Sequence, residues 1–351
     1  MSFRSLIRRI HNNSPVPVQT AIRLIYGRLP AKVKLGKEFA GYCDMLAKSE
    51  WLLREDLEAM QLVKLQELIT HCSERVPYYK TLFKKIGFKP EHLKTLADIR
   101  NIPPISKADL REYFEQLCAI NSTEYKPEEC TSGGSTGEPV KFLLDHKSLI
   151  MEKACLNRHW LKSGYKQGEP NVNLRGLRLT LKPGRYWLKE QGENCLYLSS
   201  YHLTPVNIGA YVEAFNNFRP TLLNTYPSNG AYFATLIEES GLKVNPLRSI
   251  VCSSETLCSY QRERMEEVFG CKVWDYYGLT ELVGNAGECE AHDGYHMAME
   301  MGLFEVLCPD DRPAEEGEVG EIVATALNNF SMPFLRYRTG DLAEFTDKPC
   351  S

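Results

Sequence analysis

Residues 222–278, LLNTYPSNGAYFATLIEESGLKVNPLRSIVCSSETLCSYQRERMEEVFGCKVWDYYG, alternate between strand-like and helical patterns. Short stretches rich in Val, Ile, Leu and Tyr (LLNTYP, SIVCSS and KVWDYYG) are separated by helical stretches (NGAYFATLIEESG and SYQRERMEEVFG). Strands that alternate with helices in this way indicate βαβ units, in which helices cover a parallel sheet. The sequence therefore predicts an α/β fold with a largely parallel sheet.

Stretches outside this run are interpreted by the same periodicities. Apolar residues at helical spacing predict an amphipathic helix pair over residues 50–76. The prolines at 103 and 104 divide the segment 89–120 into short helices. The remaining expectations are a helix at 146–163, strands at LRLTLK (177–182) and LYLSSY (196–201), a helix at 207–218, and a β-rich unit at 296–345 that includes EIVATAL.

Composition excludes two classes of protein. The net charge of -3 over 351 residues provides no basic field that would hold nucleic acid. No stretch approaches the roughly 18 consecutive apolar residues of a membrane-spanning helix, so we expect none. The twelve cysteines are scattered, and no signal-peptide pattern precedes them. This usage indicates reduced thiols in a cytoplasmic protein.

A glycine-rich segment at residues 131–139, TSGGSTGEP, lies between two strand-like stretches. Glycine permits close backbone approach and positive φ, so that free N–H groups and hydroxyls can surround phosphate oxygens. Lys141 follows closely enough to add positive charge. The segment matches neither GxxxxGK[ST] nor GxGxxG, and taken alone it also fits an ordinary flexible turn.

Two further motifs occur downstream. In DYYGLTE (275–281) a strand ends in tyrosines, a glycine turns the chain, and Thr280 and Glu281 follow. A tyrosine face can stack on a purine ring, and a glutamate oxygen can hold Mg²⁺. In YRTGD (337–341) Asp341 follows a tight turn, where its carboxylate can accept both hydroxyls of a ribose. Either motif alone is common at strand ends and turns.

Together and in this order, the three motifs resemble the core motifs of the adenylate-forming (AMP-binding) superfamily, which includes acyl-CoA synthetases, peptide-synthetase adenylation domains and luciferases. The resemblance covers about residues 120–345. SGGSTGEP, PVPVQTAIRLIYG and NFSMPFLRYRTGDLAEF look most like the phenylacetate-CoA ligase-like branch. Within that branch they look most like CapK-type proteins of capsular polysaccharide gene sets.

The resemblance implies the large N-terminal domain of that family: two α/β layered subdomains and a smaller β-rich subdomain, a distorted barrel. We expect an N-terminal helical segment at 1–120 packed on the first α/β subdomain, a nucleotide-binding α/β core at 121–295, a β-rich subdomain at 296–345 and a truncated hinge at 346–351. Family members continue into a small mobile domain whose lysine contacts the reacting carboxylate. A chain without that domain is expected to bind ATP or AMP but to adenylate slowly; a stand-alone protein is the alternative.

The resemblance also assigns roles. The glycine-rich loop would surround the β- and γ-phosphates, Tyr277 would stack on adenine, and Asp341 would bind the ribose. Thr280 would contact the α-phosphate and Glu281 would bind Mg²⁺. The implied nucleotide-site residues are Ser132, Gly133, Gly134, Ser135, Thr136, Gly137, Lys141, Ser253, Ser254 and Glu255 (a wall of the adenine site), Asp275 (near the amino edge of adenine), Tyr276, Tyr277, Gly278, Arg338 and Asp341.

Two departures from the family pattern affect these assignments. The family lysine directly follows the loop proline, whereas here Val140 does and Lys141 comes one place later. On a strand, a shift of one residue points the side chain to the other face. The family also often has an arginine soon after TGD, where this chain has Ala-Glu. Arg336 or Arg338 would have to substitute for that missing cation.

The resemblance implies an acyl site between the region of Tyr201 and His202, the segment after Tyr226 and the residues that flank YGLTE. These segments are polar and small rather than rich in Leu, Ile and Phe. That content favours a small or polar acid over a long acyl chain. His202 would act in the reaction by gating this site or, alternatively, would cap a turn.

Cys252, Cys258, Cys289 and His296 raise the question of a structural zinc site. Cys289, His292 and His296 have ligand-like spacing, and some relatives in the family carry structural zinc in this neighbourhood. The alternative is that these cysteines are buried hydrophobic residues, since no CxxC pair is present.

The sequence thus predicts an ATP-dependent, AMP-forming ligase that uses Mg²⁺ to activate a carboxylic acid as an acyl-AMP. The expected acceptor is CoA, an amine or a sugar, the last in capsular or cell-surface polysaccharide biosynthesis by analogy. The alternative is a degenerate nucleotide-binding scaffold or regulatory protein of polysaccharide assembly. A kinase of unrelated α/β fold is disfavoured because no Walker lysine or kinase signature occurs.

Overall fold

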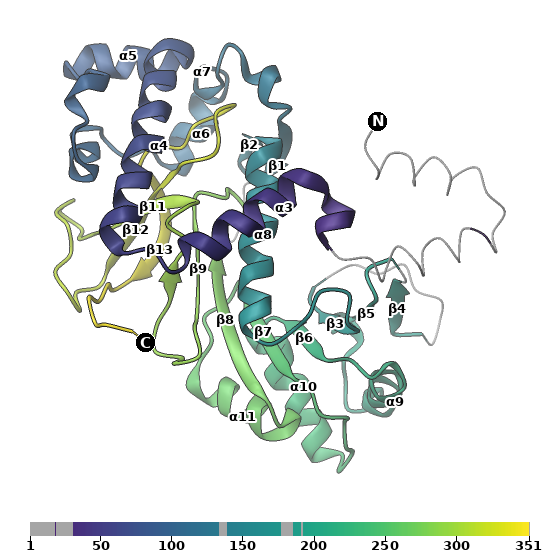
Figure 1. Ribbon diagram of the computed structural model, residues 1–351. Coiled ribbons are helices and arrows are strands. Elements are labelled where there is room, and N and C mark those ends of the chain that lie inside the picture. Colours follow the sequence, from purple (N-terminus) through teal and green to yellow (C-terminus); the bar gives the residue numbers. More distant parts are fainter. Residues whose placement is uncertain (1–17, 19–30, 133–138, 177–184, 191, 351) are drawn as a thin grey trace. The chain divides into compact units, whose positions relative to one another are not determined.

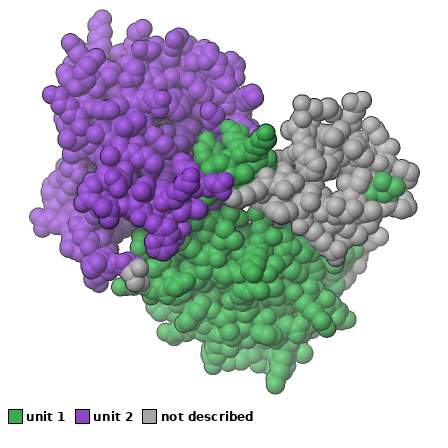
Figure 2. Space-filling model, in the orientation of Figure 1, with its two compact units in different colours: residues 1–43, 156–277, 287–296 green, residues 44–155, 278–286, 297–351 purple. Residues whose placement is uncertain are grey.

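The computed structural model of the chain describes Val18 and residues 31–132, 139–176, 185–190 and 192–350. The chain divides into two compact units, which Figure 2 distinguishes by colour. Unit 1 consists of residues 1–43, 156–277 and 287–296, and unit 2 consists of residues 44–155, 278–286 and 297–351. Each unit combines segments that are far apart in the sequence. The domain boundaries expected at 120 and 295 stay a prediction.

Unit 1 is built on a largely parallel sheet (Figure 1). Its strands are β3 Asn171–Leu174, β4 Trp187–Glu190, β5 Cys195–Leu198, β6 Leu222–Thr225, β7 Ser249–Ser253 and β8 Lys272–Gly278. The short strands β9 Asn285–Gly287 and β10 His296–Met297 each have residues in both units. Strands β8, β7, β6, β3 and β5 are parallel in that order, and β4 pairs antiparallel with β5. Because β5 and β6 lie on opposite sides of β3, the chain order reverses between β3 and β6.

Helices of unit 1 follow the strands as the alternation predicts. They are α9 Ile208–Phe218 after β5, α10 Pro227–Glu239 after β6 and α11 Ser259–Phe269 after β7, with a 3₁₀ turn, η4 Ser200–His202, directly after β5. Pro227 begins α10, where its missing N–H has no intrahelical partner to lose. Gly270, at φ 66°, ends α11 in the left-handed conformation. β6 is buried throughout, as expected of a strand covered on both faces.

Unit 2 contains helices, a two-stranded hairpin and a three-stranded antiparallel sheet. The helices are α4 Arg54–Arg75, α5 Pro77–Ile86, α6 Lys107–Glu112 and α7 Phe114–Leu117, with 3₁₀ helices η1 Pro90–His92, η2 Leu96–Asn101 and η3 Ser122–Tyr125. The hairpin is β1 Glu128–Thr131 with β2 Lys141–Leu144, and the sheet is β11 Gly302–Leu307, β12 Gly320–Ala326 and β13 Tyr337–Ala343. Helices α3 Ala31–Ser49 and α8 His146–Lys162 have residues in both units.

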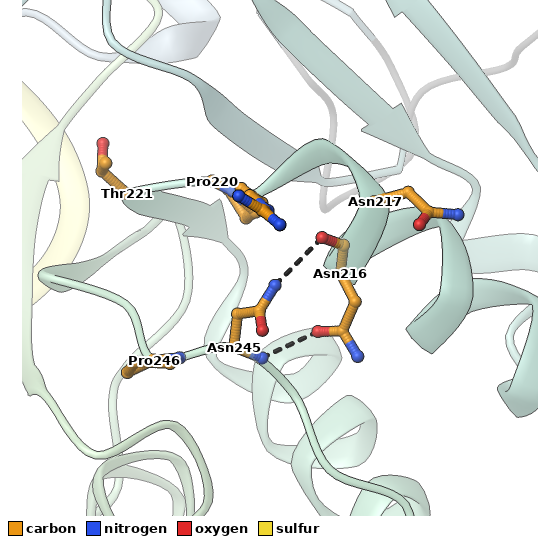
Figure 3. A pocket seen from close by; sticks show the side chains of 7 residues that line it. Asn216, Asn217, Pro220, Thr221, Asn245 and Pro246 are labelled. Atoms are coloured by element: carbon orange, nitrogen blue, oxygen red, sulfur yellow. Dashed lines mark hydrogen bonds between the residues drawn. The ribbon is translucent and has the colours of Figure 1, made fainter.

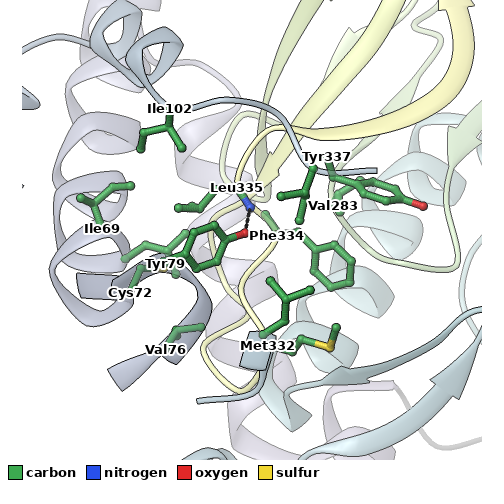
Figure 4. Close-up of a cluster of buried hydrophobic side chains, with 14 of the residues drawn as sticks. Ile69, Cys72, Val76, Tyr79, Ile102, Val283, Met332, Phe334, Leu335 and Tyr337 are labelled. Atoms are coloured by element: carbon green, nitrogen blue, oxygen red, sulfur yellow. Dashed lines mark hydrogen bonds between the residues drawn. The ribbon is translucent and has the colours of Figure 1, made fainter. Parts of the chain in front are cut away.

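One hydrophobic core explains why the segments of unit 2 belong together. Phe142 of β2, Val283 and Phe334 are buried in the same cluster as the apolar faces of α4 and α5. Figure 4 shows the hydroxyl of Tyr79 directed at the backbone of the segment before β13. That hydroxyl accepts the N–H of Leu335 at 3.1 Å and donates to the carbonyl of Pro333 at 3.1 Å. Long-range packing therefore joins the N-terminal helices to the C-terminal sheet.

Within the described residues most predicted elements agree with the structure, although the strand predicted at 196–201 ends at Leu198 and a 3₁₀ helix follows it. KVWDYYG coincides with β8, the glycine-rich segment lies between two paired strands, and residues 146–162 form α8. The helix pair predicted for residues 50–76 is wrong, because that stretch contains one continuous helix, α4. The non-helical connection lies before it, between the end of α3 at Ser49 and the start of α4 at Arg54. LRLTLK at 177–182 lies outside the described residues.

Two expectations drawn from composition, reduced cysteines and the lack of a membrane-spanning helix, can be compared with the described residues. All twelve cysteines are free thiols, as expected. Among the described helices, none has both the length and the apolar composition needed to cross a membrane.

Candidate functional site

In unit 1, polar side chains meet where parallel strands end. Arg175 follows β3, Tyr226 follows β6, and Ser253 ends β7. Nη2 of Arg175 donates to Oγ of Ser253 at 2.8 Å and to Oγ of Ser254 at 2.7 Å. The guanidinium carbon lies 4.6 Å from the centroid of the Tyr226 ring. Open α/β sheets bind ligands outside the carboxyl ends of their strands where the chain order reverses, which here is between β3 and β6.

The predicted residues after β7 are part of this edge. Ser254 adopts a positive φ of 72°, which is uncommon for a residue other than glycine. The carboxylate of Glu255 accepts the backbone N–H and the hydroxyl of Ser228, both at 3.0 Å, at the start of α10. A carboxylate at a helix N-terminus is stabilised by the helix dipole. Ser253, Ser254 and Glu255 thus lie at this edge of the sheet, and their role as a wall of the adenine site stays a prediction.

Arg175 is a residue that the sequence interpretation missed. It belongs to no recognised motif, and the strand that precedes it, β3, is only four residues long. The available signal was its place directly after a buried strand of a parallel sheet, at the edge where ligands bind.

The end of β8 presents its tyrosines unequally. Tyr276 is buried, Tyr277 is half-buried and Gly278 is exposed. The carboxylate of Asp275 is buried, accepting the hydroxyl of Tyr295 and, at 3.0 Å, the N–H of Tyr276. Burial, together with the charge of Glu288, raises the pKa of Asp275. Asp275 therefore belongs to a buried polar cluster, and its contact with adenine stays a prediction.

The region of Tyr201 and His202 directly follows β5. A ring nitrogen of His202, Nδ1, lies 2.8 Å from Oγ of Ser199, and Nδ2 of Asn207 donates to the carbonyl of His202 at 3.0 Å. These contacts fit the turn-capping alternative, and a gating role for His202 stays a prediction. The hydroxyl of Tyr201 donates to the carbonyl of Gly176 at 3.3 Å, which brings this segment to the end of β3.

In unit 2, the central and late motifs meet. The hydroxyl of Tyr337 donates to Oε1 of Glu281 at 3.0 Å, and both side chains are buried. Burial and the charge of Glu281 raise the pKa of Tyr337, so that its hydroxyl keeps its proton. Among the described residues, Oε2 of Glu281 has no hydrogen-bond partner. A carboxylate oxygen so held suits Mg²⁺ as a hard ligand. Thr280 and Asp341 are exposed beside these two motif residues in sequence.

The strands around the glycine-rich segment pair as predicted. Ser132 closes the hairpin, because its N–H donates to the carbonyl of Val140 at 2.9 Å and its Oγ accepts the N–H of Val140 at 3.0 Å. Gly133, Gly134, Ser135, Thr136 and Gly137 lie outside the described residues. Lys141 is exposed and pairs with Glu129 at 3.0 Å, whereas Val140 is buried. Val140 therefore points to the buried face and Lys141 to the exposed face, as expected when the lysine is shifted by one residue.

The two arginines expected to replace the missing cation, Arg336 and Arg338, both have carboxylate partners. Arg336 is buried, and its guanidinium donates to both oxygens of Glu305, at 2.8 and 3.1 Å. Arg338 pairs with Glu321 at 2.5 Å and also with Asp311. The prediction that Arg336 supplies the missing cation is therefore wrong, because Glu305 balances its charge inside the core. The charge of Arg338 is partly offset by Glu321 and Asp311, and its role at the nucleotide stays a prediction.

The four residues predicted as zinc ligands are not brought together. Cys252 is buried in β7, where burial raises the pKa of its thiol. Cys258 is exposed at the start of α11. Among the described residues, a group with metal-ligand spacing includes Cys289 and His296 but neither Cys252 nor Cys258. The four-residue zinc prediction is wrong because β7 holds Cys252 inside the sheet.

A pocket of about 530 Å³ lies at the other end of the sheet of unit 1. Figure 3 shows the hydrogen bonds that join two of its asparagines: the backbone N–H of Asn245 donates to Oδ1 of Asn216 at 2.7 Å, and Nδ2 donates to the carbonyl of Asn216 at 2.9 Å. The lining residues are Asn216, Asn217, Arg219, Pro220, Thr221, Asn245 and Pro246. They precede β6 and β7, so the pocket borders the amino ends of the strands rather than the motif edge.

The burial of His159 in α8 leads us to expect that the stability of the chain depends on pH. The histidine ring packs against Tyr276 at 5.1 Å and Trp274 at 6.1 Å, and its Nε2 is buried without a hydrogen-bond partner. Burial, reinforced by Lys162, lowers the pKa of His159 to about 4, below its unfolded value of 6.5. Because the unfolded chain binds this proton first, the stability is full above pH 6.5 and falls as the pH drops toward 4.

From pH 7 to pH 5 this histidine is expected to cost about 2 kcal/mol of unfolding free energy. Urea denaturation of the chain and of His159→Phe at both pH values measures it. Between pH 7 and pH 5, the unfolding free energy of His159→Phe should fall by about 2 kcal/mol less than that of the unaltered chain, whatever the stability of the variant at pH 7. An identical pH dependence in both proteins would contradict the assignment.

Comparison with known proteins adds relatives and a fold. No family model matches the chain. It is 32% identical over 315 residues to phenylacetate-coenzyme A ligase of Thermus thermophilus, covering 86% of this chain and 68% of that protein. It is 24% identical over 353 residues to protein CapK of Staphylococcus aureus, covering 98% of this chain and 74% of that protein. Phenylacetate-coenzyme A ligase of Escherichia coli is 26% identical over 82% of this chain and 67% of its own length.

Solved structures resemble the same part of the chain. The crystal structure of 2-hydroxyisobutyryl-CoA ligase in complex with R3-HIB-AMP, in the postadenylation state, superposes with a TM-score of 0.67. The match covers 85% of this chain and 65% of that enzyme at 21% identity. At that identity the likeness shows the fold, and it confirms the predicted α/β architecture. The chain spans about two thirds of the length of that enzyme and of the ligase relatives.

Proposed function

Because the chain belongs to the phenylacetate-coenzyme A ligase family of adenylate-forming, ATP-dependent ligases, we propose that it activates a carboxylic acid as an acyl-AMP. The observation that carries this proposal is the contact between Glu281 and Tyr337, 3.0 Å long, which joins the central motif to the late motif. Two motif residues separated by 56 positions are held in one buried pair, so neither is an isolated turn or strand end.

In the proposed reaction, a carboxylate oxygen of the acid attacks the α-phosphorus of ATP. The new O–P bond forms as the bond to the bridging oxygen breaks, and pyrophosphate leaves with that electron pair. No protein nucleophile is needed, because positioning and charge neutralisation carry such a displacement. Bound Mg²⁺ would neutralise phosphate charge. Glu281 would hold it through Oε2, while Tyr337 fixes the carboxylate through Oε1.

Other parts of the nucleotide site complete the proposal. Tyr277 would stack on adenine at the end of β8, and Ser253 to Glu255 would wall the adenine. Asp341 would accept the ribose hydroxyls from its exposed position after Gly340, which turns the chain at φ 81°. Ser132 would orient the phosphate loop through its two hydrogen bonds to Val140.

The finer parts of the proposal concern acid, acceptor and location. The polar residues near the carboxyl edge favour a small or polar acid. The named activity of the ligase relatives favours CoA as the acceptor. The similarity to CapK over 98% of the chain supports a role in cell-surface polysaccharide synthesis, with an amine or sugar as the other candidate acceptor. The cysteines, none of them in a disulfide, favour a cytoplasmic location.

A second candidate is a nucleotide-binding scaffold without adenylation. It is favoured by the cations: Lys141, Arg336 and Arg338 all have carboxylate partners, which offset part of the positive charge that they would offer to phosphate. The two candidates differ in what they bind best, since an enzyme favours states along its reaction whereas a scaffold has no such preference.

Calorimetry with AMP and with non-hydrolysable acyl-adenosine sulfamates, which imitate the acyl-AMP, separates the two. An adenylate-forming site should bind at least one sulfamate about 100-fold more tightly than AMP. Acid-dependent exchange of pyrophosphate into ATP would add to that result. Equal affinity for AMP and every sulfamate would favour the scaffold, and failure to bind AMP would reject both candidates.

A further inference from the structure

Arg175 is held rigidly at the carboxyl edge of unit 1 by neutral groups alone. Its Nη2 donates to the hydroxyls of Ser253 and Ser254, at 2.8 and 2.7 Å, and its guanidinium lies over the ring of Tyr226. Arg175 follows β3, and the residues that hold its guanidinium lie at the ends of two other strands, β6 and β7. Arginine in such a planar, stacked setting is pre-organised for hydrogen bonding.

A second feature of Arg175 is that it has no acidic partner in the part of the chain that the structure describes. Among the described residues no carboxylate pairs with it, in contrast to Arg336 and Arg338. Its Nε is buried without an acceptor, and Nη1 has no hydrogen-bond partner within the described part of the chain. A buried donor without an acceptor is costly, and a fixed guanidinium binds carboxylate strongly. The site is therefore incomplete as it stands and suited to an anionic group.

The backbone after Arg175 connects this cation to two aromatic side chains. The carbonyl of Gly176 accepts the hydroxyl of Tyr201 at 3.3 Å. A Cβ at Gly176 would lie 3.7 Å from that hydroxyl oxygen and 3.7 Å from the ring of Tyr226. Arg175, Tyr201 and Tyr226 thus surround the end of β3 where the strand order reverses, which is where a small ligand binds in an open α/β sheet.

We propose that Arg175 binds a second anionic group on the acid, so that the site selects acids with a negative group besides the reacting carboxylate. This inference rests on the proposed function. The reacting carboxylate loses its negative charge when it becomes the acyl group of the acyl-AMP. A cation that bound it would therefore stabilise the substrate more than the transition state and slow the reaction. A second anionic group keeps its charge throughout, so its pairing with Arg175 holds the acid before and after adenylation.

The test uses acyl-adenosine sulfamates in matched pairs. Succinyl, glutaryl and adipyl sulfamates carry a terminal carboxylate, and the corresponding terminal amides have the same shape without the charge. Calorimetry on the chain should show a preference of about 10- to 100-fold for the carboxylate in at least one pair. Arg175→Gln should abolish that preference by weakening the carboxylate sulfamates far more than their amides or AMP, whereas Arg175→Lys should retain part of it.

Arg264→Gln is the matched control, because Arg264 already pairs with Glu238 on the surface of unit 1. This variant should keep the full preference. No carboxylate preference in any pair, or a preference that survives in Arg175→Gln, would overturn the inference. An equal loss of AMP affinity in Arg175→Gln would assign the arginine to the nucleotide instead. Failure of the unaltered chain to bind AMP would reject the proposed function itself and this inference with it.

Discussion

Glu281→Gln is expected to slow acid-dependent pyrophosphate exchange by about 100- to 1,000-fold. The amide still accepts the hydroxyl of Tyr337, which lies 3.0 Å from Oε1, so the fold around it should persist. What is lost is the negative oxygen that would hold Mg²⁺ against the phosphates. The variant should also lose the gain in ATP affinity that Mg²⁺ provides, while AMP binding is unchanged. Exchange assays and calorimetry with and without Mg²⁺ measure both effects.

Two further variants control this result. Tyr337→Phe removes only the hydroxyl that orients Glu281, and is expected to cost about 10-fold in exchange rate, as supporting residues of a metal site do. Glu124→Gln changes an exposed carboxylate elsewhere in unit 2 and should have no effect. If Glu281→Gln kept its exchange rate and its Mg²⁺ dependence, the assignment of Glu281 would be wrong.

Glu305→Ala is expected to lower the unfolding free energy by about 3–5 kcal/mol. Glu305 is 8% exposed and Arg336 is 5% exposed, and the two form a bidentate pair at 2.8 and 3.1 Å. Nη1 of Arg336 also donates to the carbonyl of Ile102 at 2.7 Å. Removing the glutamate leaves a buried guanidinium whose charge the carbonyls alone do not offset. Urea denaturation at neutral pH measures the loss.

The double variant Glu305→Leu with Arg336→Met distinguishes an unpaired charge from lost packing. Replacing both partners by apolar side chains should recover most of the stability, because no buried charge remains. Glu238→Ala, which breaks the exposed pair with Arg264, should change stability little. A loss in the double variant as large as in Glu305→Ala would show that the packing of these side chains, rather than their charge, is what matters.

The sequence predicted the nucleotide motifs but not which charges remain free. YGLTE and YRTGD are recognisable because their residue types and spacing are local. The carboxylates that engage Arg336 and Arg338 lie 31 and 17 residues away. Nothing in the neighbouring sequence marks such partners, and the prediction that Arg336 could replace the missing cation failed for that reason, whereas the role of Arg338 stays a prediction. Cys252 was misassigned in the same way, because its place inside β7 depends on the strands beside it.

Local features of the sequence were enough to predict the α/β alternation, the strand that ends in DYYG, the strands on either side of the glycine-rich segment and the three motifs of an adenylate-forming ligase. Periodicity and motif chemistry are local, so they can be recognised without a partner. The three-dimensional contacts were needed to show that Tyr337 bonds Glu281, and that Arg175 reaches the hydroxyl of Ser254 from 79 residues away. Those pairings follow from the order of strands in the sheet and from one shared hydrophobic core. Both depend on packing between distant segments, which no short stretch of sequence encodes.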